Sequence, residues 1–157
     1  MWRLQISLFT ILFAMIFVEA SVLPFIWADL RVDFFIGMII GQIICIPFSQ
    51  GFPFVILSAL ILQAFSGARI GLIPFAYILV FLFLDTVKNL VYFENIYTQM
   101  VLGFICYLVL TGIFLIFADT PALGGKALPL VFGAVLSGAI SPAMISIVCR
   151  LQTVYDS

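Results

Sequence analysis

The sequence contains no histidine, and only 8% of its 157 residues are charged. Without histidine there is no imidazole base, no histidine metal ligand and no serine–histidine catalytic arrangement. Six basic and seven acidic side chains give a net charge of −1, which excludes the clustered basic surface that nucleic-acid binding needs. Water-soluble domains have about a quarter of their residues charged, so the composition also excludes most soluble folds.

Cysteine is scarce as well. The three cysteines, Cys45, Cys106 and Cys149, lie far apart inside apolar segments. This spacing indicates neither a disulfide framework nor a thiolate metal site. We expect all three side chains to act as small buried hydrophobic groups, and we predict no metal and no cofactor.

Apolar residues make up 66% of the chain, which predicts an integral membrane protein. A helix needs about 20 residues to cross about 30 Å of hydrocarbon. The first run and the last two runs are long enough, whereas the central region divides into three shorter pieces. We predict an all-α polytopic membrane protein forming a single domain over residues 1–157, with about six spans and five as the alternative. The expected spans are 4–28, 34–48, 52–65, 70–92, 96–117 and 128–148.

Prolines and one charged pair refine these spans. Pro53 and Pro129 fall where the first turn of a helix tolerates a missing N–H, and Pro142 should bend the last helix. The fourth span could continue past Asp85 and Lys88, which are spaced i,i+3 and can form a structural ion pair, as far as residue 92.

The positive-inside rule does not decide the orientation, because six spans place three basic residues on each side. An even number of spans puts both termini on one side of the membrane. Arg3, ahead of the first span, favours the cytoplasm for that side.

Ionisable side chains at membrane depth are candidates for function because removing a charge from water is costly. Glu19, in the first span, could face a partner helix, a proton path or a ligand amine, or it could lie paired or protonated near the interface. Asp29, Arg31 and Asp33 form a compact charged hinge between the first two spans. The hinge is either a solvated turn or a device that fixes where the second helix begins.

Small residues spaced four apart allow helix backbones to approach closely. Such pairs are Gly37 with Gly41 and Gly67 with Gly71, and the last span carries a similar stripe. Its members are Gly133, Ala134, Ser137, Gly138 and Ser141. These stripes could pack within the chain or against another protein.

No arrangement of residues indicates catalysis. Asp29 and Asp33 straddle a turn with no further acid nearby, and the sequence has no phosphate-binding glycine loop. We therefore predict that the protein is not an enzyme.

Two stretches between residues 30 and 84 carry recognisable motifs. LRVDFF at 30–35 resembles the R-P-D-L-L motif at the start of the second span in the MreD family of rod shape-determining membrane proteins. GFPFVILSALILQAFSGARIGL at 51–72 is similar to that family's G-F-x-x-G-L-L-x-D and D-L-L-S-G-x-x-L-G-L segments. Two positions differ, since Val32 stands where the family usually has Pro and Gln63 where it usually has Asp.

The resemblance implies a non-enzymatic scaffold in the bacterial inner membrane. Such proteins act with MreC, the MreB filament and the elongation peptidoglycan synthases to maintain rod shape. By this analogy Arg31, Asp33, Ser66, Gly67 and Gly71 fall on motif positions. On physical grounds we expect Ser66 and Gly67 to end one helix and Gly71 to admit a close neighbour. The candidates for partner binding or helix packing are Glu19, Arg31, Asp33, Gly37, Gly41, Ser66, Gly67 and Gly71.

MreD-like proteins are also similar in size and span number to the substrate-binding components of energy-coupling-factor vitamin transporters. This alternative requires a closed cavity on the order of several hundred Å³. Glu19, Gln42, Asn89 and Tyr107 are its candidate lining residues. A third possibility, a small channel or proton-coupled carrier, requires charged residues on consecutive helices to line one path.

Overall fold

A computed structural model of the protein describes residues 2–21, 32–66, 71–90, 93–117 and 127–156. Over these ranges the chain is all-helical and contains no strand, which confirms the predicted class. The helices in them are α1 (Trp2–Ser21), α3 (Phe34–Cys45), α4 (Phe48–Ser66), α5 (Leu72–Val87), α6 (Ile96–Phe117) and α7 (Ala127–Asp156). Three helices, α4, α6 and α7, are long and apolar enough to cross a membrane.

The observed helix ends differ from the expected ones at α3, α4 and α7. Helix α3 ends at Cys45, before the expected end at residue 48. The expectation that Pro53 lies in a first turn is wrong, because α4 begins at Phe48 and holds Pro53 in its interior. The carbonyl of Pro47 accepts from the backbone N–H groups of Gln50 and Gly51, both at 3.0 Å, and so starts the helix earlier. The last helix extends to Asp156, beyond the expected end at residue 148.

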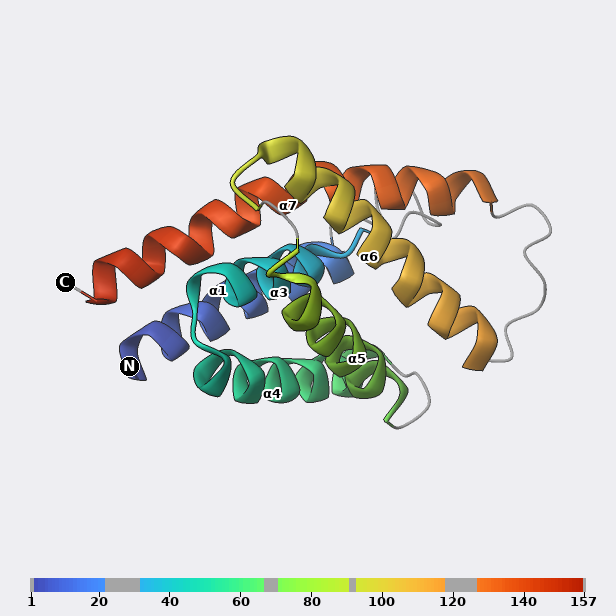
Figure 1. The fold of residues 1–157 in the computed structure, drawn as a ribbon. Coiled ribbons are helices and arrows are strands. Elements are labelled where there is room, and N and C mark those ends of the chain that lie inside the picture. The colour runs from blue at the N-terminus through green and yellow to red at the C-terminus, as the bar shows by residue number, and fades with distance from the viewer. Residues whose placement is uncertain (1, 22–31, 67–70, 91–92, 118–126, 157) are drawn as a thin grey trace.

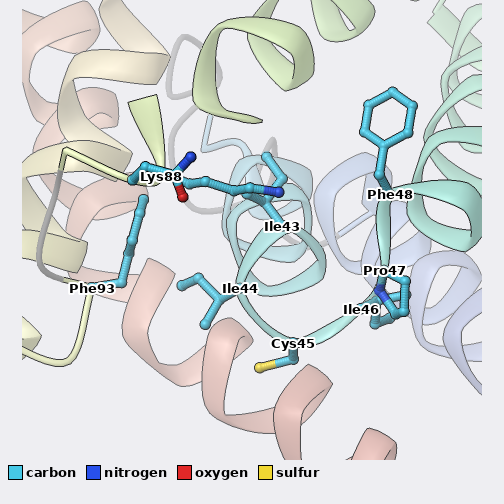
Figure 2. Close-up of a pocket in the computed structure, with 9 residues that line it drawn as sticks. Ile43, Ile44, Cys45, Ile46, Pro47, Phe48, Lys88 and Phe93 are labelled. Atoms are coloured by element: carbon cyan, nitrogen blue, oxygen red, sulfur yellow. The ribbon is translucent and has the colours of Figure 1, made fainter. Parts of the chain in front are cut away.

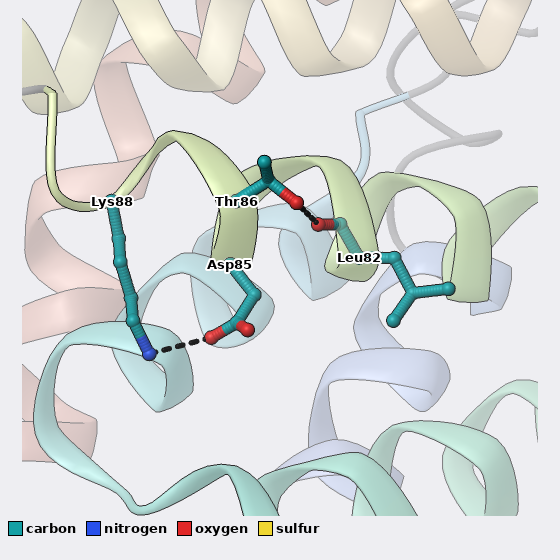
Figure 3. A network of polar contacts seen from close by, with 4 residues as sticks. All are labelled: Leu82, Asp85, Thr86 and Lys88. Carbon is teal, nitrogen blue, oxygen red and sulfur yellow. Dashed lines mark hydrogen bonds and ion pairs between the residues drawn. The ribbon is translucent and has the colours of Figure 1, made fainter.

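The extension of α5 toward residue 92 is also wrong over the described part of the chain. The helix ends at Val87, and residues 88–90 form a turn in which the Leu90 N–H donates to the Val87 carbonyl at 2.8 Å. The predicted ion pair between Asp85 and Lys88 is confirmed, with 2.6 Å between Oδ1 and Nζ (Figure 3). Beside it, the Thr86 hydroxyl donates to the Leu82 carbonyl at 2.9 Å.

Helix α7 organises the bundle, because it packs against α3, α6 and α1. Pro142 lies inside it, and Figure 1 shows the helix changing direction between its orange and its red part. The predicted bend is therefore present. On the other side of α3, the α4–α5 pair completes the bundle.

Helices α3 and α7 run parallel in a constant register. The Asp33 N–H donates to Ser137 Oγ at 2.9 Å, and Cys45 is disulfide-bonded to Cys149; each pair is 104 residues apart in sequence. Between them, the close contacts of Gly37 with Ser141 and of Gly41 with Ile145 keep the same offset. The four contacts recur every fourth residue, so one ridge of each helix lies along the other over the whole length of α3.

The expectation that no cysteine forms a disulfide is wrong for Cys45 and Cys149. Their Cα atoms are 5.4 Å apart, within the usual range for a disulfide. The register of two helices remote in sequence creates this proximity, and the spacing along the chain does not reveal it. Cys106 is a buried free cysteine, as predicted.

Candidate functional site

Asp33 is the residue around which the candidate site is built. It lies directly before α3, and its Oδ1 accepts from the backbone N–H groups of Phe35 at 2.9 Å and Ile36 at 3.2 Å. This is an N-cap, which satisfies two of the donors that a helix start leaves free. The second carboxylate oxygen accepts from the Tyr77 hydroxyl of α5. Because the Asp33 N–H donates to Ser137, this residue connects α3, α5 and α7.

The site lies well inside the apolar part of the bundle. Asp33 is level with Ser137, which is about 14 Å along α7 from Leu128 at about 1.5 Å per residue, and the apolar stretch of α7 runs from Leu128 to Tyr155. The neighbouring Val32 is buried. The sequence left open whether the charged hinge is a solvated turn or fixes where a helix begins. Asp33 does the latter, since it caps the start of α3. Asp29 and Arg31 lie outside the described residues.

Two further polar side chains join Asp33, Tyr77 and Ser137. Glu19 of α1 and Tyr107 of α6 both interact electrostatically with Tyr77. We call these five residues the polar cluster; it draws one member from each of α1, α5, α6 and α7 and one from the start of α3. Glu19 itself is half-buried near the end of α1.

Two serines of the small-residue stripe on α7 lie at the polar cluster, Ser137 as a member of it and Ser141 beside it. Ser137 and Ser141 are both buried, and the Ser141 hydroxyl donates to the Ser137 carbonyl at 2.8 Å. Gly138, one residue round the helix, faces Phe104 of α6 at close range. The small residues of this stripe pack within the chain.

Gly37 and Gly41 lie buried at the contact between α3 and α7. A Cβ atom on Gly37 would be 2.8 Å from Met144 Cβ, and one on Gly41 would be 3.0 Å from Val148 Cβ. No larger side chain fits at either position without displacing α7. Both glycines are therefore helix-packing residues inside the chain, and another protein cannot reach them in this structure.

The start of α5 is held by residues that the sequence motifs contain. Gly71 precedes the helix with φ +89°, and among the described residues a Cβ atom there would meet nothing within 4 Å. No described neighbour therefore approaches Gly71 closely, and glycine is suited to this position because of its backbone conformation. Gln63 Oε1 accepts from the Ile73 N–H at 3.2 Å, across the junction. Ser66 is the last residue of α4, and Gly67 lies outside the described residues.

The open surface of the bundle carries two depressions. One, of about 450 Å³, lies where α3 ends and the α5–α6 connection begins (Figure 2). Its lining residues are Ile43, Ile44, Cys45, Ile46, Pro47, Phe48, Lys88, Asn89 and Phe93. The other, of about 290 Å³, lies between α1 and α7, and its lining includes Ala14, Val18, Phe34 and Met144. Of the proposed ligand-lining residues, Asn89 alone borders either of these two depressions.

Sequence reasoning missed Tyr77 and the cysteine pair. A signal for the pair was present: Gly37, Gly41 and Cys45 are spaced by four, and Ser137, Ser141 and Cys149 fall on a second ridge with the same period. Tyr77 gave a weaker signal, as a hydroxyl within an otherwise apolar run.

Comparison with protein-family models, with curated proteins and with solved structures finds no match to the chain.

Proposed function

We propose that the protein is a non-enzymatic scaffold of the bacterial cell-elongation complex. In this proposal it is a multi-pass inner-membrane protein similar to MreD, and it binds a membrane-anchored partner such as MreC in support of peptidoglycan synthesis.

The observation that carries the proposal is the placement of the motif residues. Asp33 starts α3, while Gln63 and Gly71 hold the start of α5. The Tyr77 hydroxyl then joins α5 to Asp33. Asp33 and Gly71 lie at motif positions, and Gln63 replaces the Asp that is usual in the family. Together they support one α3–α4–α5 unit, and structural support is the role expected of motif residues in a non-enzymatic protein.

The parallel course of α3 and α7 supports six spans. After α3, the chain must return to the side where α7 begins, and this takes an odd number of crossings by α4, α5 and α6. When α4 and α6, which are each long enough to cross, both cross, this count requires α5 to cross as well. Its 16 residues rise about 24 Å, so the span is short and borrows flanking residues or thins the bilayer.

The partner-binding surface follows from what is already occupied. Gly37 and Gly41 face α7, so the glycine stripe cannot serve as the docking face. The remaining surfaces are the outward sides of α1, α4, α5, α6 and α7, where large apolar side chains are exposed. Examples from the first four of these helices are Phe17, Leu57, Leu82 and Ile116.

The vitamin-binding alternative would draw on a closed cavity with convergent polar groups. The two depressions described above are open, and the second is lined by apolar side chains. In the polar cluster, Asp33 is already hydrogen-bonded to Ser137 and to Tyr77 of the same chain. These features favour the scaffold over the solute-binding protein.

Gene deletion in the native bacterium tests the proposal. We expect cells to lose their rod shape, and the wild-type gene to restore it. A photoreactive amino acid at Phe17, Leu57, Leu82 or Ile116 should crosslink a membrane-anchored protein at one or two neighbouring faces. Normal rods together with impaired vitamin uptake would favour the alternative, and normal rods with crosslinks to lipid only would exclude the scaffold role.

A further inference from the structure

The Cys45–Cys149 bond is the last contact of the α3–α7 register. The preceding contacts, at Asp33–Ser137, Gly37–Ser141 and Gly41–Ile145, bring the two helices together at the same offset. Cys45 is the final residue of α3. The two sulfur atoms therefore meet because of the packing of the whole helix pair, and the bond does not depend on a local loop.

The bond lies near one end of the bundle. Cys149 is three residues before Gln152 and next to the exposed Arg150 on α7. The Ser7 hydroxyl of α1 is 2.8 Å from the Tyr155 hydroxyl, so the start of α1 and the end of α7 lie at this same end.

Polar side chains also lie at the end of the bundle that holds the disulfide, and the surface there is a depression open to the surroundings. Lys88 and Asn89 line the depression of about 450 Å³ together with Cys45 (Figure 2). Both bonded cysteines are only partly buried. Thiols at these positions are therefore exposed to the redox conditions of the compartment that this end faces.

We propose that the end of the bundle holding the start of α1 and the end of α7 faces the oxidising side of the membrane, where Cys45 and Cys149 are joined. Structural disulfides persist in the periplasm and other oxidising compartments, and the cytoplasm keeps thiols reduced. In a bacterial inner membrane this places both chain ends in the periplasm. The arrangement is the reverse of the orientation that Arg3 favoured, and the tied count of basic residues does not oppose it.

The bond forms by thiol–disulfide exchange with a disulfide-bonded oxidant protein of that compartment. One cysteine thiolate attacks the oxidant's disulfide and gives a mixed disulfide, from which the second cysteine displaces the oxidant. The two cysteine thiols lose two protons and two electrons, and the oxidant's disulfide becomes a dithiol.

Counting thiols tests the bond. Whole cells are quenched with acid, and the denatured full-length protein is alkylated with a mass-tagged maleimide before and after reduction. We expect one tagged thiol before reduction, Cys106, and three afterwards. The variant Cys106→Ala should show none and then two, whereas Cys45→Ser should show two in both conditions. Three tagged thiols in the unreduced wild-type protein would overturn the proposal.

A peptide tag fused after Ser157 tests the orientation on the otherwise native chain. External protease should remove the tag from sealed spheroplasts. A tag that is cleaved only after permeabilisation would overturn the proposal, even where the thiol count shows a bond. Neither measurement involves a binding partner, so the result is independent of the scaffold function. The double variant Cys45→Ala with Cys149→Ala, carrying the same tag, controls for an effect of the bond on insertion.

Discussion

The Tyr77 hydroxyl donates a hydrogen bond to the carboxylate of Asp33, and this bond joins α5 to the start of α3 inside the apolar part of the bundle. Tyr77 is buried, and its ring also meets the ring of Phe35 edge-on, with 4.9 Å between centroids. A polar contact and an apolar one thus act between the same two helices. Hydrogen bonds of this kind between membrane helices contribute about 0.6–2 kcal/mol each.

Replacing Tyr77 with Phe should lower the free energy of unfolding by about 1–3 kcal/mol. The ring contact with Phe35 is kept, but one carboxylate oxygen of Asp33 loses its donor, and an unsatisfied buried acceptor is costly. Thermal unfolding of the purified protein in detergent measures the change. Tyr97→Phe is the matched control, since Tyr97 is 72% exposed and the loss of its hydroxyl should have no effect. Equal melting temperatures for the two variants would contradict the role given to Tyr77.

Substitutions of Asp33 should separate its capping role from its charge. Asn retains an oxygen that can accept from the Phe35 and Ile36 N–H groups, and it is as good an N-cap as Asp. Ala removes the cap and the acceptor for Tyr77 together. We expect Asp33→Ala to cost about 2 kcal/mol or more and Asp33→Asn clearly less. Chemical denaturation in mixed micelles gives the order, and a reversed order would refute the capping argument.

Adding a methyl group at Gly37 should be destabilising. The new Cβ of Gly37→Ala would lie 2.8 Å from Met144 Cβ and 3.1 Å from Ser141 Cα, so α3 and α7 must separate. Overpacking of this kind costs about 1–3 kcal/mol. Gly112 of α6 is the control, because a Cβ atom there meets nothing within 4 Å. Gly112→Ala should be neutral or should stabilise the protein by up to about 1 kcal/mol.

Gln63 is expected to accept Asp, the residue usual in the MreD family, more readily than Leu. The Asp side chain is shorter than that of Gln, but its carboxylate still offers an acceptor near the Ile73 N–H. Its negative charge is also favourable near the start of α5. Leu removes the acceptor. Protein level in the membrane and melting temperature should fall for Gln63→Leu and change little for Gln63→Asp. If both variants behave alike, the hydrogen bond to Ile73 does not support the α4–α5 junction.

The sequence allowed the helices to be predicted better than their contacts. Residues 96–117 form α6 with the expected bounds, because a long uniform apolar run depends little on its neighbours. The Asp85–Lys88 pair was predictable because it is local. The position of Asp33 within the apolar span and the Cys45–Cys149 bond both depend on the register between α3 and α7. That register is set by packing between side chains that lie more than a hundred residues apart in the sequence. The apolar periodicity of a single helix contains no information about it.

Position 33 also determines the electrical balance at the half-buried start of α3. The aligned peptide groups of α3 place about half a positive elementary charge at its first turn, and the Asp33 carboxylate lies against that turn. A neutral, non-capping side chain there would leave the partial charge without a counterpart in a poorly screening medium. A small anion such as chloride would then be attracted to a place that the wild-type protein keeps for its own carboxylate.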